Sequence, residues 1–186
     1  MSNPDRGRGV VAAVVGALLF LAVAGSAEAQ LRAGSAELKA VTGKVEVQEK
    51  GQPQWAPAVV GAKLAEGDQI RAYAGGSAIL GLPDGSTLFV AENSRVAVSK
   101  LEVDQQNQSR NVLVHLVVGK VRAVVAKSSI SLVRARQSNF AITTPTAVAA
   151  ARGTDFEVTF NDIQQVMRVA VLPEPRDGSK RGAGSL

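Results

Sequence analysis

The chain has 186 residues, a formal net charge of +5 and 46% hydrophobic residues, with one His and no Cys. Without Cys it can form neither disulfides nor a thiolate zinc site, and one His does not supply a transition-metal site, so we expect no cofactor. Beyond an N-terminal export segment, the chain has the length of one domain and can bury a core by packing alone.

Residues 1–29 are predicted to be an export signal. Arg6 and Arg8 precede an unbroken apolar run, and an A-x-A cleavage site ends at Ala29, directly before Gln30. The apolar run has about 15 residues, fewer than the roughly 20 that span a membrane. We therefore expect cleavage, a periplasmic or secreted protein, and no remaining membrane span. The alternative is an uncleaved signal that anchors the chain in the inner membrane.

The composition after the signal divides the chain into three parts. Residues 30–39 are expected to form a linker, and residues 40–172 an all-β domain. Residues 173–186 are polar, basic and rich in Gly, which predicts a disordered tail.

Alternating apolar and polar residues predict the first strands. One strand is expected over residues 40–48, and residues 60–71 contain a turn that opens the next. Between them, Trp55 either caps the core or offers its ring to a sugar. Residues 77–82 and 87–90 flank the turn Pro83-Asp84-Gly85-Ser86, which predicts a hairpin.

A further set of strands follows this hairpin. We expect a strand over residues 93–98, a polar loop over 104–111, and two strands, 112–118 and 120–125, on either side of Gly119. The triplet Gly119-Lys120-Val121 repeats Gly43-Lys44-Val45, a weak internal repeat. Turn residues recur about every 8–12 positions without a helical period. This pattern predicts an all-β fold, either a twisted two-sheet sandwich or a short solenoid-like stack of antiparallel strands.

The most distinctive segment joins two alternating stretches, residues 139–143 and 155–160. The five small residues 147–151 lie between them, bounded by Pro145 and Gly153, which argue against a helix. We expect these small residues to form a tightly packed extended segment beneath a neighbouring strand. The two flanking strands are expected to pair with each other.

This segment resembles the T-P-x-A-x-A-x-x-R-G-T-[ED]-F signature of the FecR family of bacterial cell-envelope domains. G-K-V-E-V, W-x-P-A, V-G-x-x-L-x-x-G-D-x-I-R, L-P-D-G-S and N-S-R-V-x-V also look like family segments, in family order, so the resemblance spans about residues 40–171. We expect the motif residues to close a packed corner, with an unusual positive φ at the glycine. The motif residues are Thr144, Pro145, Arg152, Gly153, Thr154, Asp155 and Phe156.

The resemblance weakens after Phe160. The family pattern is a D-G turn, a strand, an E-G turn and a final strand. Here Asn161-Asp162 and residues 166–171 match the first turn and strand, but Pro173-Glu174-Pro175 replaces the second turn. The final strand is not expected, so one sheet edge is left open.

The resemblance implies a role in envelope signalling. The best-known FecR-family members carry a cytoplasmic sigma-regulating helix, a membrane span and a periplasmic domain that reads an outer-membrane iron-siderophore transporter. Only about nine residues precede the apolar run here, so we do not expect sigma regulation by this chain. The first hypothesis is an exported module that binds an envelope protein, an outer-membrane transporter or an inner-membrane sensor.

No catalytic constellation is found in the sequence. His115 lies within an apolar run and is interpreted as a half-buried strand residue rather than a general base. There is no G-x-S-x-G elbow, phosphate-binding glycine loop or acidic metal cluster. We expect a protein that is not an enzyme.

Charge is distributed unevenly along the chain. No acidic residue occurs between Gln105 and Thr154, so the cations there form either a solvated face or a basic binding face. A basic face supports the second hypothesis, a structural or glycan-associated module on peptidoglycan or anionic polysaccharide. Nucleic acid is not expected, because the chain is exported and lacks interleaved aromatic residues. The candidate basic residues are Arg110, Lys120, Arg122, Lys127, Arg134 and Arg136.

Overall fold

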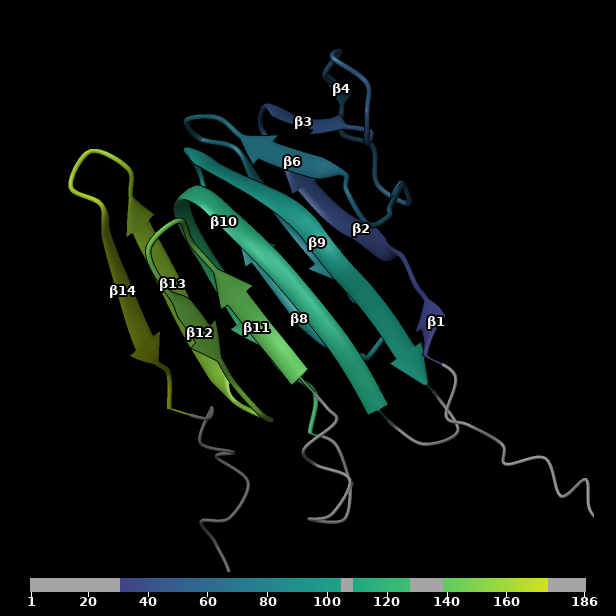
Figure 1. Cartoon of the computed structure of the whole chain (residues 1–186). Helices are drawn as coiled ribbons and strands as arrows, with labels where there is room; N and C mark the ends of the chain where they lie inside the picture. The colour runs from purple at the N-terminus through teal and green to yellow at the C-terminus, as the bar shows by residue number, and fades with distance from the viewer. Residues whose placement is uncertain (1–30, 105–108, 128–138, 174–186) are drawn as a thin grey trace, which may run out of the picture. The chain divides into compact units, whose positions relative to one another are not determined.

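The computed structural model describes residues 31–104, 109–127 and 139–173, and every regular element in these ranges is a β-strand (Figure 1). The expected all-β fold is therefore confirmed. The predicted export signal and basic tail lie outside the described residues. The strands are β1 (Arg32–Ala33), β2 (Ala36–Thr42), β3 (Val45–Gln48), β4 (Ala56–Pro57), β5 (Lys63–Leu64), β6 (Gln69–Ala72), β7 (Ser77–Gly81), β8 (Thr87–Val90), β9 (Ser94–Asp104), β10 (Ser109–Val124), β11 (Asn139–Thr143), β12 (Val148–Ala150), β13 (Asp155–Asn161) and β14 (Val166–Val171).

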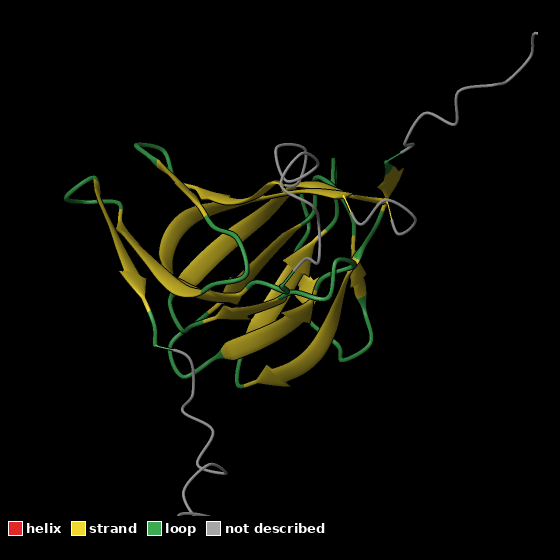
Figure 2. Cartoon of the chain, turned by 90° about the horizontal axis from the view of Figure 1, so that it is seen from below, coloured by secondary structure: helices red, strands yellow, loops and turns green. Residues whose placement is uncertain are grey.

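The strands form two layers that face each other across the core (Figure 2). The first sheet has the order β4-β3-β6-β9-β10-β11-β12, with β1 beside the far end of β9. The second sheet has the order β5-β2-β7-β8-β10-β13-β14. Neighbouring strands are antiparallel except β10 and β11, which are parallel. The expected two-sheet sandwich is thus present.

Strand β10 belongs to both sheets. Residues 109–118 pair with β9 and β11 in the first sheet, and residues 119–124 pair with β8 and β13 in the second. The strand changes sheet at Gly119, which has a φ of 99°. A Cβ at this position would lie 2.6 Å from the carbonyl oxygen of Asn93, so only glycine fits. The two strands expected around Gly119 are therefore halves of one bent strand.

Other connections between the two sheets also use a positive φ. Gly43-Lys44 takes the chain from β2 in the second sheet to β3 in the first, so the single strand expected over residues 40–48 is two strands. The two similar Gly-Lys-Val triplets thus both mark crossings between the sheets. The residues with positive φ at such crossings are Gly43, Gly61, Gly67, Gly75, Asn93, Gly119 and Gly153.

The core lies between the sheets, and three phenylalanines fill its C-terminal part. Phe140 of β11 and Phe156 of β13 meet edge to face, with ring centroids 6.2 Å apart and an interplanar angle of 88°. Phe160 is buried beside them in the same core cluster. Since β11 lies in the first sheet and β13 in the second, the expected pairing of these two strands is wrong. Their side chains meet across the core instead.

The alanine-rich segment is extended, as expected, but it is not tightly packed along its length. Among the described strands, β12 pairs only with β11 and forms the end of the first sheet. Ala149 points into the core, whereas Val148 is 66% exposed. The expected cover by a neighbouring strand is not found, because within the described ranges β12 is an edge strand with β11 on one side and no strand on the other.

The domain begins earlier than the expected boundary at residue 40. Strand β2 pairs with β5 and β7, and its residues Ala36 and Leu38 are completely buried. Residues 32–39 therefore contribute to the sheets, where a linker was expected. The expected polar loop is also shorter, because β9 reaches Asp104 and β10 begins at Ser109.

Candidate binding surfaces

The first half of the motif closes the turn between β11 and β12. The Thr144 N–H donates to the Ala147 carbonyl (2.8 Å), and the Ala147 N–H donates to Thr144 Oγ1 (3.1 Å). Thr144 is buried, and Pro145 is exposed at the tip. These residues stabilise a hairpin and present no reactive group.

The second half of the motif takes the chain from β12 to β13. Gly153 has a φ of 57°, which confirms the positive φ expected there. The Thr154 hydroxyl donates to the Arg152 carbonyl (2.8 Å) and holds the turn. Phe156 is buried, whereas the Arg152 side chain points to solvent. The motif therefore positions the crossing and the core phenylalanine.

Asp155, the acidic residue of the motif, pairs with Arg122 on β10. Arg122 Nε donates to Asp155 Oδ1 at 2.8 Å, and this hydrogen bond lowers the pKa of the Asp155 carboxyl. On the same face, Lys120 Nζ lies 3.2 Å from Glu157 Oε1. Two candidate basic residues are thus neutralised by carboxylates of β13.

The described candidate basic residues do not form one unpaired basic face. Arg110 is buried, and Lys120 and Arg122 are in ion pairs. Lys127 lies against Gly153 and is not without an interaction partner. Arg134 and Arg136 lie outside the described residues. The neutralising carboxylates, Asp84, Asp155 and Glu157, lie outside the acid-free stretch, and the sequence does not show that strand pairing brings them to these cations.

Arg110 forms a buried polar cluster with the turn between β7 and β8. Its Nη1 donates to Asp84 Oδ2 (2.7 Å) and to the Ala126 carbonyl (3.1 Å), while its Nε has no partner among the described residues. The Ser86 hydroxyl donates to Asp84 Oδ2 (2.6 Å) and accepts the Ala126 N–H (3.0 Å). This cluster is structural, because its charges are directed inwards and at each other.

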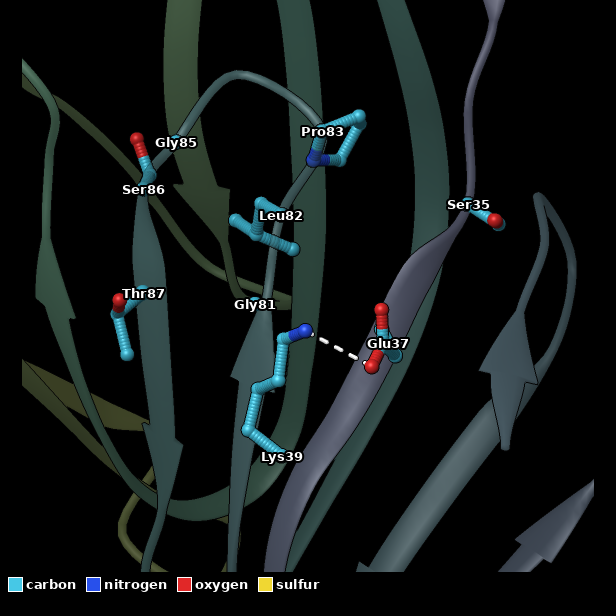
Figure 3. Close-up of a pocket in the computed structure, with 9 residues that line it drawn as sticks. All are labelled: Ser35, Glu37, Lys39, Gly81, Leu82, Pro83, Gly85, Ser86 and Thr87. Atoms are coloured by element: carbon cyan, nitrogen blue, oxygen red, sulfur yellow. Dashed lines mark ion pairs between the residues drawn. The ribbon is translucent and has the colours of Figure 1, made fainter. Parts of the chain in front are cut away.

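An open depression of about 350 Å³ lies beside the same turn (Figure 3). The charged side chains of its lining, Glu37 and Lys39, are paired at 2.8 Å, so the lining offers no unpaired charge. The lining residues are Ser35, Glu37, Lys39, Gly81, Leu82, Pro83, Gly85, Ser86 and Thr87.

His115 is half-buried on the outer face of the first sheet, where its Nδ1 lies 2.9 Å from Thr143 Oγ1. Among the described residues, no group of three or more His, Cys, Asp and Glu side chains could hold a metal ion. The described ranges also contain no helix long and apolar enough to span a membrane.

Trp55 lies in a cluster of arginines and aromatic rings on the outer face of the first sheet. The Arg71 guanidinium carbon is 4.0 Å from the Trp55 ring centroid, and that of Arg95 is 5.4 Å away. The positions of Glu46, Arg71 and Arg95 face one another on β3, β6 and β9. We call these residues, with Lys44 and Tyr73, the Trp55 surface.

Hydrogen bonds hold the Trp55 surface in place. Arg71 donates from Nε (2.9 Å) and Nη2 (2.6 Å) to Glu46 Oε2, which also accepts the Tyr73 hydroxyl (2.9 Å). The Arg71 hydrogen bond is the main cause of a lowered pKa at Glu46. Arg95 Nε and Nη2 donate to Gln69 Oε1 at 3.0 and 2.8 Å. Charged and aromatic groups are thus held rigidly at a half-exposed surface.

Sequence reasoning missed this surface. Trp55 was considered alone, as a core cap or a sugar platform. The outward positions of 45–48 and 69–72 are visible in their alternation. The sequence does not show how these two strands are registered against each other and against β9. It is this register that brings Glu46, Arg71 and Arg95 into one row.

The comparisons with known proteins identify the family. The family model described as FecR protein matches residues 68–173, more than half of the chain. The chain belongs to the FecR family. The matched range begins just before β6 and ends just after β14, so it includes Arg71, Tyr73, Arg95 and the whole motif. FecR is a family of cell-envelope signalling proteins. No curated protein and no solved structure matches the chain.

Proposed function

We propose that this FecR-family chain is a non-enzymatic module, exported through its N-terminal segment, that binds an envelope protein during signalling. The observation that carries the proposal is the Trp55 surface. Trp, Tyr and Arg are the residue types most enriched at energetically important positions of protein interfaces. Here Trp55, Tyr73 and Arg71 are adjacent, half-exposed and fixed by hydrogen bonds and stacking.

The charge of this surface indicates the chemistry of the partner. Lys44, Arg71 and Arg95 outnumber the single carboxylate of Glu46, which pairs with Arg71 and Lys44. The Arg95 guanidinium donates to the neutral Gln69 amide and has no ion pair among the described residues. An acidic protein surface with an apolar centre would complement this arrangement.

Site-specific photo-crosslinking in the envelope of the native bacterium tests the proposal. A photoreactive amino acid at Gln54, exposed beside Trp55, should crosslink to one envelope protein. The same group at Lys63, exposed on the second sheet, is the matched control and should not. Trp55→Ala should abolish the Gln54 crosslink while leaving the thermal unfolding midpoint close to that of the wild type. A crosslink that is equal at Lys63, or unaffected by Trp55→Ala, would refute the proposal.

The glycan-associated alternative rested on the candidate basic residues. Burial of Arg110 and the ion pairs of Lys120 and Arg122 weaken that argument. Pelleting with purified cell wall at low and high salt tests it directly. Salt-sensitive pelleting that is lost on combining Arg134→Glu with Arg136→Glu would favour the glycan function, and no binding at either salt concentration would count against it.

A further inference from the structure

Strand β14 is unusual among the strands at the ends of the two sheets. Strands β4, β5 and β12, which end the sheets elsewhere, have two or three residues, and β4 contains a proline. Strand β14 has six residues, and within the described residues it pairs only with β13 (Figure 1). Natural proteins protect such edges with short strands, prolines, bulges or lysines. Residues 166–171 contain no proline, bulge or lysine, and Arg168 is their single charged residue.

The free edge of β14 also has apolar side chains on its core side. Val169 and Val171 lie opposite the buried Val158 and Phe156 of β13, yet they are 51% and 70% exposed. In the described part of the chain the first sheet ends at β12 and does not cover these valines. The edge therefore presents both unpaired backbone groups and apolar surface.

The hydrogen-bond pattern shows which backbone groups are available. The Leu172 N–H donates to the Asp155 carbonyl at 2.8 Å, so this pair is a hydrogen-bonded one. Hydrogen-bonded pairs alternate along an antiparallel ladder, so Arg168 and Ala170 also direct their N–H and C=O groups towards β13. Met167, Val169 and Val171 direct theirs away from it.

We propose that two copies of the chain pair antiparallel through β14, about a two-fold axis at Val169. With a two-fold axis perpendicular to the sheet, residues that face each other in the two copies have their side chains on the same side of the sheet. The backbone groups that point away from β13 belong to the odd-numbered residues of β14. Centring on Val169 pairs it with its own copy and gives the longest ladder, because Met167 then faces Val171 of the second copy. This proposal is independent of the Trp55 surface.

The side chains in this register are compatible with a second copy. Arg168 faces the small Ala170 of the other copy and not its own counterpart, so no like charges meet. In the second copy, Ala170 pairs with Glu157 of β13. This Glu157 lies within the reach of the Arg168 side chain of the first copy. On the core side, Met167, Val169 and Val171 of the two copies form one continuous apolar row. A single six-residue strand buries less surface than a standard interface, so the dimer forms in the micromolar range or above.

Cysteine crosslinking tests the register, and the absence of native Cys makes every introduced thiol unique. Val169→Cys should give disulfide-linked dimers under mild oxidation, because facing Cα atoms about 5.5 Å apart suit a disulfide. Val148→Cys, at a valine of β12 that is even more exposed (66% against 51% for Val169), is the matched control and should remain monomeric. Val171→Cys alone should not crosslink, but a mixture with Met167→Cys should.

Sedimentation of the purified chain from about 1 to 500 µM tests the association itself, and the range brackets the expected micromolar affinity. The wild type should shift from monomer to dimer, and Val169→Lys should raise the dissociation constant at least tenfold. Val169→Pro should act likewise, since it removes only an N–H that points away from β13. A wild type that stays monomeric throughout, or Val169→Cys crosslinking no better than Val148→Cys, would overturn the proposal. Either result would leave this edge to a strand from a different protein.

Discussion

Arg110 and Asp84 form an ion pair that is almost completely removed from water, with 2.7 Å between Nη1 and Oδ2 and side-chain exposures of 6% and 3%. Arg110 lies at the start of β10, in the first sheet, and Asp84 lies in the turn between β7 and β8, in the second. Ser86 donates its backbone N–H and its hydroxyl to the same carboxylate. The pair therefore ties the two sheets together at one end of the sandwich.

Asp84→Ala should lower the free energy of unfolding by about 3–5 kcal/mol, because it leaves the buried Arg110 guanidinium without a counter-charge. Urea denaturation measures this change. The double variant Asp84→Ala, Arg110→Met should be more stable than the single variant, since it removes the stranded charge as well. A single variant within about 1 kcal/mol of the wild type, the range of exposed pairs, would contradict the assignment of a buried pair.

Gly119→Ala should destabilise the chain much more than Gly85→Ala. Both glycines have positive φ, 99° and 82°, so both variants incur the cost of about 1–3 kcal/mol for a strained φ. A Cβ at Gly85 meets nothing closer than Ala126 Cβ at 3.6 Å, whereas one at Gly119 would lie 2.6 Å from the Asn93 carbonyl oxygen. Equal thermal unfolding midpoints for the two variants would show that β10 can bend without this close approach.

Gly153→Val should lower stability by about 1–3 kcal/mol, because a β-branched residue resists the φ of 57° at this position. Its Cβ would also lie 3.2 Å from Lys127 Cγ. Gly153→Asn is the control, since asparagine tolerates the left-handed region better than other residues. Thermal unfolding should rank the wild type first, Asn second and Val last, and Val equal to Asn would contradict the prediction.

Local signals in the sequence predicted much of the fold. Strands β7, β8 and β14 follow the expected alternation between turn residues, and Gly153 has the expected φ. The first part of strand β2, residues 36–39, was missed; its two buried positions are Ala36 and Leu38, and the alanine gives only a weak apolar signal. These outcomes depend on residues adjacent in the chain, where alternation and turn chemistry act.

What failed depends on the pairing of distant segments. The pairing expected between residues 139–143 and 155–160 was wrong, because β12 separates them and each joins β10 from a different sheet. The pairing of Arg110 and Arg122 was missed for a related reason, since Asp84 and Asp155 reach these two cations only through strand register. The Trp55 surface requires three strands in one row. A single sequence does not encode such registers in any local pattern.

Arg122→Gln should reduce stability at neutral pH but not in strong acid. Because Arg122 lowers the pKa of Asp155 in the folded chain, the stabilisation is complete above the ordinary aspartate pKa of about 3.9. It is lost as the pH falls through the lowered folded-state pKa. Denaturation at pH 7 and near pH 2 measures the difference. Arg32→Gln, which removes an exposed cation that has no ion pair among the described residues, should show no such pH-dependent gap.

The bent strand β10 also determines how the domain comes apart. Most sandwiches have two layers joined only by loops, so one layer can loosen while the other persists. Here one unbroken backbone hydrogen-bonds to four neighbours in both layers. Releasing either layer therefore frees half of β10 and weakens the support of the other half. Native-state amide exchange from Ser109 to Val124 should accordingly report a single opening free energy, that of global unfolding, with no separable cooperative unit on either side of Gly119.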